Sequence, residues 1–284
     1  MIHWRMFLSD LWSRTMRNTA YIVWYTLLDQ IRQRSFLVLL GMGIVLVLLT
    51  RACYNGAWSV NGQQIDGVTL AWHASLMAFQ VIVTAMYLVV TLLAVRLFGR
   101  DRDDGSLVLF LSRPISRWQY ALGRIAGLWI LTGVCMFILH LTVFCVMWTK
   151  TGGTIPGFLS ASLICSINLL FIIVLASLLS LYMPEIVAAL AGVFVIVIGF
   201  VSDGGFQLMN SDLVRSAIPS EIAGTPALWR IVYPKFFMVQ SWAGSLITRE
   251  EFTNMGPVHP VVNLALYCGV LVTLLVVSFN RREI

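Results

Sequence analysis

The sequence predicts an all-α integral membrane protein with six transmembrane helices, and three observations lead to this fold class. Hydrophobic residues make up 59% of the chain and charged residues only 11%, whereas a typical soluble domain has about 25% charged residues. The mean hydropathy is +0.86. The apolar residues also gather in runs of the length that a helix needs to cross a bilayer, about 20 residues.

Six apolar runs are candidates for the spans. They cover residues 36–50, 71–97, 120–147, 158–182, 186–201 and 261–279. Only Met183, Pro184 and Glu185 separate the fourth run from the fifth. Proline disfavours helix at the residue before it and suits the first turn of a new helix, so we expect a tight hairpin of two spans there. Residues 35–284 thus form one six-span domain, with a long external segment at 202–260.

Two amphipathic stretches, residues 4–15 and 21–33, precede the first span. In the first stretch, Trp4, Phe7 and Leu11 fall on one helical face and polar residues occupy the rest. Such a pattern suits a helix lying in the headgroup plane, and Trp24 and Tyr25 suit an interfacial aromatic belt. We therefore expect residues 1–34 to form N-terminal interfacial helices on the lipid membrane. The alternative is that they are ordinary cytosolic helices packed on the protein.

The basic residues indicate the orientation. With the N-terminus in the cytosol, one side of the membrane holds 13 Lys and Arg residues and seven acidic residues, and the other side holds six of each. Cytosolic loops carry the excess of basic residues, so both termini are predicted to be cytoplasmic. The basic residues are spread over helix ends and loops. The net charge of +6 therefore reflects topology and predicts no nucleic-acid partner.

The cytosolic loop at residues 98–119, between the second and third spans, carries the most informative motif. It contains acidic Asp103 and Asp104, then Gly105, Ser106, Leu107, Leu109, Phe110 and Leu111, then Arg113, Pro114 and Arg117. Its apolar run of five residues is too short to span a bilayer. Exposing it would cost about 25 cal/mol per Å² of apolar surface, so the run needs a partner surface.

This loop resembles that of ABC-2 type permeases. The similarity is carried by Asp104-Gly-Ser-Leu-x-Leu-x-Leu-Ser-Arg-Pro-Ile-Ser-Arg117, followed by Tyr120-x-Leu-Gly-Arg124. The multicopper-enzyme-maturation branch of that family is the most similar. Weaker likenesses occur at 28–36, at 233–237 with Trp242, and at 279–284. The chain departs from the family in having Arg124 where lysine is commoner, and an aspartate cluster in place of a lone glutamate.

The resemblance implies a transporter subunit that is not itself an enzyme. Residues 106–112 would be a coupling helix that docks in a groove of a separate ATPase subunit, present in two copies. A second permease subunit, identical or different, would complete the assembly in a bacterial or archaeal inner membrane, and export is the favoured direction. The chain has no GxxxxGK[ST] loop, so ATP and magnesium are expected in the partner. No catalytic residue, cofactor or metal site is predicted in this chain.

Polar and aromatic residues outside this loop are candidates for the transport path. His140 and Asn168 lie inside spans and could line a pathway, although hydrogen bonding between helices is the alternative. In the external segment, the aromatic residues could form a re-entrant hairpin that gates the outer end, or a cap resting on the membrane surface. The gate candidates are Trp229, Tyr233, Phe237 and Trp242.

A second class of function stays open, that of a membrane anchor subunit in a haem or quinone redox enzyme. A bundle that holds haem needs paired axial ligands at matching depth. Only His140 lies well inside a predicted span, and His73 lies at an outer end. The sequence does not identify a cargo for the transporter, because Met, Cys and His residues are scattered along the chain.

Overall fold

The computed structural model describes residues 2–32, 59–60, 63–64, 67–103, 105, 115–152, 157–209, 233–248, 252 and 258–281. It also describes residues 36, 37, 40, 41, 43–45, 47 and 48, all of which are helical. The described part is helical apart from one hairpin of two-residue strands. The elements are α1 (Ile2–Ile31), β1 (Ser59–Val60), β2 (Gln63–Gln64), α3 (Gly67–Asp103), α5 (Arg117–Thr151), α6 (Gly157–Tyr182), α7 (Glu185–Met209), α10 (Phe236–Thr248) and α11 (Pro260–Arg281).

Five helices, α3, α5, α6, α7 and α11, are long and apolar enough to cross a membrane. They coincide with five of the six predicted spans, and the chain therefore has the fold of an all-α, multi-pass membrane protein. The predicted span at 36–50 is described only at single positions, all of them helical. The number of six spans thus stays a prediction.

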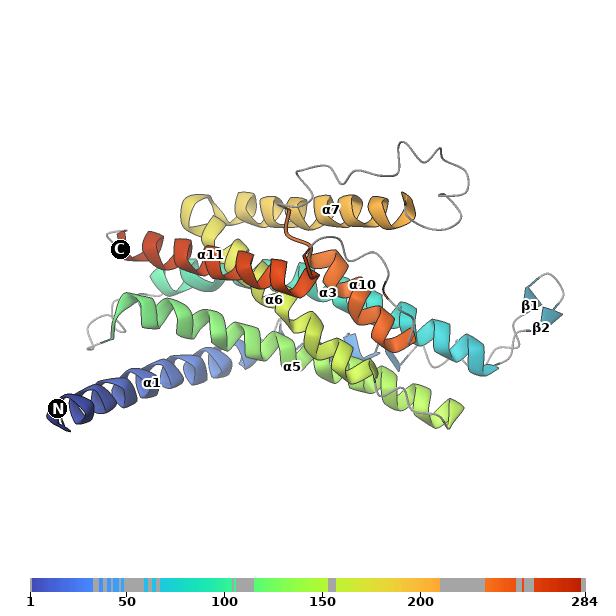
Figure 1. Cartoon of the computed structure of the whole chain (residues 1–284), viewed down its shortest axis with the longest axis horizontal. Helices are drawn as coiled ribbons and strands as arrows, with labels where there is room; N and C mark the ends of the chain where they lie inside the picture. The colour runs from blue at the N-terminus through green and yellow to red at the C-terminus, as the bar shows by residue number, and fades with distance from the viewer. Residues whose placement is uncertain are drawn as a thin grey trace.

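The candidate spans run alongside one another, with both chain ends at one end of the bundle and the β1–β2 hairpin at the other (Figure 1). The ends of α3 and α6 and the starts of α5 and α7 also lie near the chain termini. We call this region the basic end, because it holds Arg96, Arg100, Arg117, Arg124 and Arg281.

Helix α6 is the centre of the bundle and packs against α3, α5, α7, α10 and α11. Roughly half of the apolar window in α3, α5 and α6 is buried inside the chain, against 22% in α7 and α11. Large apolar side chains cover the outer faces of those two helices. They include Ile186, Leu190 and Phe194 on α7 and Leu266 and Val270 on α11. Helices with such faces suit contact with lipid or with a second membrane protein.

The turn between α6 and α7 is as tight as the sequence predicted. Helix α6 ends at Tyr182 and α7 begins at Glu185, directly after Pro184. The far end of α7 differs from the prediction. The helix continues to Met209, whereas the sequence placed the end of this span at residue 201 and the start of the external segment at 202. The polar Ser202 and Asp203 ended the apolar run, yet both lie inside the helix.

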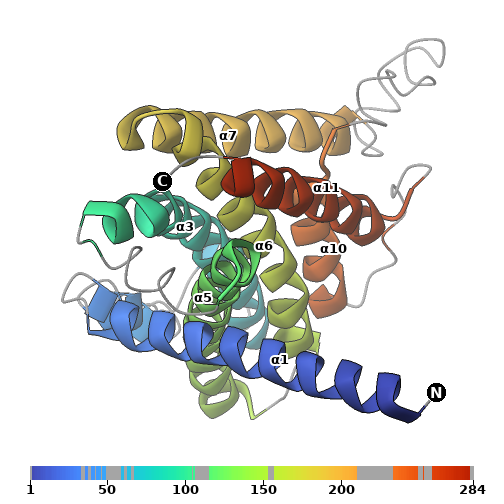
Figure 2. The same cartoon turned by 90° about the vertical axis from the view of Figure 1, so that its left-hand side faces the viewer.

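The N-terminal stretches predicted separately form one helix, α1, which crosses α5 near the basic end (Figure 2). Ile22 and Thr26 are buried against α5, where Gly123 and Gly127 form a Gly-x-x-x-Gly pair. A Cβ on Gly127 would lie 2.6 Å from Cβ of Thr26, so only glycine permits this approach. Tyr21 and Trp24 are exposed on another face of α1, a distribution that suits a helix at the membrane surface.

Candidate functional site

A group of charged side chains joins three helices at the basic end. Arg124 of α5 donates from Nε to Oδ2 of Asp101 on α3 over 2.7 Å, and from Nη2 to Oδ1 of the same carboxylate. Tyr120 also donates to Oδ2 of Asp101. Asp29 of α1 lies 3.8 Å from Nη1 of Arg124 and 3.5 Å from Nη2 of Arg100. We call these five residues the charge cluster.

Arg124 is surrounded by groups that satisfy or screen its charge. Both Arg124 and Asp101 are almost completely buried. Nη1 of Arg124 also donates to Oγ1 of Thr26 over 3.4 Å, and the guanidinium lies 5.7 Å from the centre of the Tyr25 ring. Removing a charge from water costs several kcal/mol, and only a paired and hydrogen-bonded geometry such as this offsets the cost. The cluster therefore fixes the positions of α1, α3 and α5 relative to one another.

The charge cluster lies next to the ends of the loop predicted to couple to an ATPase. Asp101 lies two residues before the last residue of α3, Asp103, and Gly105 follows with a φ of +69°. A positive φ favours glycine and turns the chain away from the helix. The chain therefore leaves α3 two residues after a buried ionic contact between α3 and α5.

The start of α5 is fixed by two further contacts. Ser116 occupies the predicted cap position, but the capping bond runs from its backbone N–H to Oε1 of Gln119 over 3.0 Å. Nη1 of Arg117 donates to the carbonyl oxygen of Asn280 over 3.5 Å, which connects α5 to the end of α11. The remaining predicted coupling residues lie outside the described part of the chain. They are Asp104, Ser106, Leu107, Leu109, Phe110, Leu111, Arg113 and Pro114.

His140, a predicted pathway residue, is buried between α3 and α6. Its Nδ1 lies 2.7 Å from Oγ of Ser162, and its Nε2 lies 3.5 Å from the carbonyl oxygen of Phe79. The imidazole also stacks on the ring of Phe79, with centroids 4.5 Å apart. Both nitrogens thus face protein groups. In this arrangement His140 connects helices, which is the alternative that the sequence left open, and neither nitrogen is directed to an axial haem position.

Asn168, the other predicted pathway residue, lies near the middle of α6 and is fully buried. Its Nδ2 donates to the hydroxyl of Tyr87 on α3 over 2.5 Å and to the carbonyl oxygen of Phe236 over 2.8 Å. Its Oδ1 accepts no hydrogen bond from the described residues. Asn168 thus joins the middle of two long helices to the first residue of α10.

Helix α10 begins at the middle of the bundle and runs toward the end remote from the chain termini (Figure 1). At its start, Phe236 bonds to Asn168 near mid-length of α6. Toward its other end, Leu246 has its backbone carbonyl against Gly157, the first residue of α6. The 13 residues of α10 rise by about 20 Å, which is more than half of a bilayer core of about 30 Å. Helix α10 is thus shorter than the candidate spans and packs inside the bundle against α6.

A second polar contact joins α10 to α3. Nε2 of Gln240 donates to Oε1 of Gln80 over 2.5 Å, and Oγ1 of Thr84 lies 3.5 Å from the same nitrogen. Oε1 of Gln240 is buried and accepts no hydrogen bond within the described part of the chain. We call the neutral group Gln80, Tyr87, His140, Ser162, Asn168 and Gln240 the polar belt.

Three of the four predicted gate residues are described, and all three lie on or beside α10. The Tyr233 hydroxyl donates to the carbonyl oxygen of Val195 on α7 over 3.1 Å. Phe237 lies against Phe200 of α7, with centroids 4.5 Å apart, and Trp242 meets His259 edge to face at 4.9 Å. They therefore attach α10 to α7 and to the start of α11. Trp229 lies outside the described residues.

Sequence reasoning missed several buried polar residues. Asp203 and Lys235 were assigned to the external segment, yet both are almost fully buried, and the Lys235 backbone N–H donates to Oδ1 of Asn263 over 3.1 Å. Gln80 and Gln240 were not singled out. Gln80 could have been singled out, because it is a polar residue inside the apolar run at 71–97. Its partner Gln240 on α10 could not be predicted without the fold.

The described residues contain no group of three or more His, Cys, Asp or Glu side chains placed to hold a metal ion. Cys135, Cys145, Cys165 and Cys268 are free thiols. No protein-family model matches the chain, and no curated protein matches it. The case for a function therefore comes from the sequence motif and the geometry described above.

Proposed function

We propose that this chain is the membrane-spanning permease subunit of an ATP-driven transporter of the ABC-2 type. The ATPase would be a separate subunit in two copies, a second permease would complete the assembly, and export is the favoured direction. The chain itself would have no catalytic activity. The proposal includes both termini in the cytosol of a bacterium or archaeon, and a coupling helix at residues 106–112.

The charge cluster is the observation that best supports this proposal. A device that transmits force from a cytosolic motor needs a rigid connection between the loop that is pushed and the helices that move. Asp101 and Arg124 form such a connection, because Asp101 lies two residues before the end of α3, Arg124 lies about two turns into α5, and the two are bonded to each other in a buried setting. Asp29 extends the connection to α1.

The proposal also includes a sixth span at 36–50. Its described residues Phe36, Leu40, Gly43 and Val47 are helical and line a pocket together with residues of α3 and α5. Their spacing of four, three and four residues places them on one helical face. An additional helix packed on α3 and α5, crossing the bilayer with them, accounts for this arrangement.

In the proposed transporter, α10 and the polar belt form the outer closure of the path. Asn168 and Gln240 each hold α10 by a neutral hydrogen bond, and such bonds between membrane helices contribute only about 0.6–2 kcal/mol each. The contacts can therefore break and re-form as the spans tilt between two states. Oδ1 of Asn168 and Oε1 of Gln240 accept no hydrogen bond from the residues that the structure describes, and they could accept one from a polar cargo.

The test is co-purification of the ATPase with the tagged chain from its native host. A single change of Leu107, Leu109, Phe110 or Leu111 to Asp places a carboxylate in the apolar run, which would then not enter a groove without burying an unpaired charge. We expect each variant to insert in the membrane at wild-type amounts and to lose the ATPase from the purified complex. The ATPase is recognised by mass spectrometry as a protein with a Walker A loop.

Arg102→Gln serves as the matched control, because it changes a charge in the same cytosolic segment, 98–119, is not among the predicted coupling residues, and leaves the apolar run intact. We expect this variant to retain most of the ATPase. Normal recovery of the ATPase with all four Asp variants would contradict the assignment of residues 106–112 as the coupling helix. A visible Soret band in the purified wild-type complex would instead favour the redox-anchor class.

A further inference from the structure

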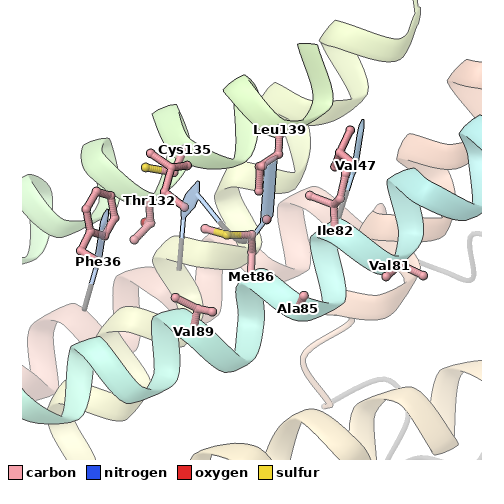
Figure 3. Close-up of a pocket in the computed structure, with 12 residues that line it drawn as sticks. Phe36, Val47, Val81, Ile82, Ala85, Met86, Val89, Thr132, Cys135 and Leu139 are labelled. Carbon is pink, nitrogen blue, oxygen red and sulfur yellow. The ribbon is translucent and has the colours of Figure 1, made fainter. Parts of the chain in front are cut away.

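An apolar pocket lies between α3, α5 and the described positions of residues 36–47 (Figure 3). Its volume is about 270 Å³. Side chains of α5, including Cys135 and Leu139, point across the pocket toward Ile82 and Met86 of α3. The pocket belongs neither to the charge cluster nor to the polar belt, and nothing in the proposed transport cycle uses it.

The described lining is almost entirely apolar. Thr132 is a polar residue in it, and its hydroxyl already donates to the carbonyl oxygen of Leu128 over 2.8 Å. A polar ligand would therefore lose its hydrogen bonds to water without replacement. An engineered apolar cavity of about 150 Å³ stays dry and binds benzene, and this pocket is larger. An apolar occupant is therefore favoured over water or a polar molecule.

The position of the pocket identifies the source of that occupant. Its lining on α3 runs from Val81 to Val89, close to the middle of the candidate span Trp72–Asp101. The eight-residue step between Val81 and Val89 corresponds to about 12 Å along the helix axis. A pocket of this length at this depth adjoins the hydrocarbon part of the bilayer.

The α3 wall of the pocket also reaches the outer surface of the bundle. Val81 lines it and is 57% exposed, and Met77, Leu88 and Leu92 on the same helix are exposed as well. Val45 and Leu48 are exposed beside the opposite wall. These apolar side chains lie where the acyl chains of the bilayer would meet the protein. An acyl chain could therefore enter sideways without crossing a polar surface.

We propose that this pocket is a lipid site that takes one acyl chain of a bilayer phospholipid, with the headgroup remaining in the membrane interface. The chain fills an elongated apolar slot that would otherwise reduce stability in proportion to its volume. The proposal does not depend on the transport function, since it uses only the apolar lining, the depth and the exposed wall on α3.

The test is photolabelling of the full chain in phosphatidylcholine vesicles that contain a trace of phosphatidylcholine with a diazirine near the middle of one acyl chain. Adducts are mapped to residues by mass spectrometry. Ile82 and Met86 in the pocket are each 7% exposed, whereas Leu266 on the outer face of α11 is 65% exposed. We expect the two pocket residues to be labelled at least as strongly as Leu266. Labelling of the pocket about ten-fold below Leu266, in line with exposure, would overturn the proposal.

Ala85→Phe is the matched blocking variant, because Ala85 lines the pocket and a phenyl ring would occupy it. We expect labelling of Ile82 and Met86 to fall about ten-fold while Leu266 is unchanged. Leu190→Phe adds the same ring at an exposed position of α7, a helix that contributes no residue to the described lining, and should leave the pattern as in the wild type. Unchanged pocket labelling in Ala85→Phe would also overturn the proposal. If this variant does not fold, Cys135→Phe blocks the slot from α5, and the wild-type map decides independently.

Discussion

Polar groups join the helices both at the basic end and in the middle of the bundle, but the two regions use different kinds of polar group. At the basic end, Arg124 and Asp101 carry full charges and are fully paired. In the middle, Asn168 and Gln240 use neutral amides. The contrast follows from depth, because a charge is costly at the centre of a bilayer and much less so near the headgroups.

This contrast predicts a rigid basic end and a more easily opened middle. Removing one partner of a buried ion pair leaves an uncompensated charge and costs about 3–5 kcal/mol. Removing one neutral interhelical hydrogen bond in a membrane protein costs about 0.6–1.7 kcal/mol. If the chain couples a cytosolic motor to an outer closure, force enters at the rigid end and motion occurs where the bonds are weaker.

The largest effect is expected for Arg124→Met, which leaves the buried Asp101 without its partner. We expect a loss of about 3–5 kcal/mol in unfolding free energy, measured by denaturation in mixed micelles. Arg96→Met is the control, since Arg96 and Glu185 form an exposed pair at 3.5 Å, and such pairs contribute about 1 kcal/mol or less. If Arg124→Met and Arg96→Met lost equal amounts of unfolding free energy, the buried ion pair would not make the basic end more rigid.

Combining Arg124→Met with Asp101→Leu sharpens the same point. The double variant carries no unpaired charge at this position, so we expect it to recover a large part of the stability lost in Arg124→Met. Under the proposed function, the ATP hydrolysis rate of the co-purified complex should nevertheless stay below that of the wild type, because the ionic connection between α3 and α5 is gone. Full recovery of ATP hydrolysis would show that the charge cluster serves stability alone.

A smaller effect is expected where α1 crosses α5. Gly127→Val places a side chain where Cβ of Thr26 would lie 2.6 Å from the new Cβ, and such overlap typically costs about 1–3 kcal/mol. We expect α1 to separate from α5 and to become sensitive to limited trypsin digestion. Gly133→Val is the control, since its nearest neighbour, Cβ of Ser166, is 3.9 Å away. Protection of α1 in both variants would contradict the contact.

The smallest effect is expected in the polar belt. Asn168→Leu removes the bonds to Tyr87 and Phe236 and should cost about 1 kcal/mol in unfolding free energy. Ser166→Ala is a suitable control, because the Ser166 hydroxyl donates within its own helix, to the Leu163 carbonyl oxygen at 2.7 Å. A loss in Asn168→Leu as large as that in Arg124→Met would contradict the view that the middle opens more easily.

The helical fold was largely predictable because hydrophobic length is a strong signal in a membrane protein. The turn at Pro184 followed from local stereochemistry, and α7 begins where that reasoning placed it. Helix α7 continues past the predicted end of its apolar run, because Asp203 interrupts the run and yet is buried in the fold. The length of an apolar run reflects the average environment of its residues. A single buried charged residue therefore ends the run, although the helix itself continues.

The site was predictable only in part. His140 and Asn168 stood out as polar residues inside spans, and both make contacts between helices. Of the charge cluster, Tyr120 and Arg124 belong to the sequence motif, but the ionic geometry could not be predicted, since Asp101 and Asp29 meet Arg124 only through the packing of three helices. The depth of α10 was left open between a re-entrant hairpin and a surface cap, because no pattern in residues 202–260 distinguishes the two.

The most direct measurement of the central claim is site-specific cross-linking from the predicted coupling helix in living cells. A photoreactive amino acid at position 109, inside the apolar run, should form a covalent adduct with a protein that carries a Walker A loop, identified by mass spectrometry. The same probe at position 266, on the outer face of α11, should not form this adduct. The absence of such an adduct from position 109 would contradict an ATPase partner for this loop. Reaction of Leu109→Cys with a membrane-impermeant thiol reagent outside the cell would contradict it as well.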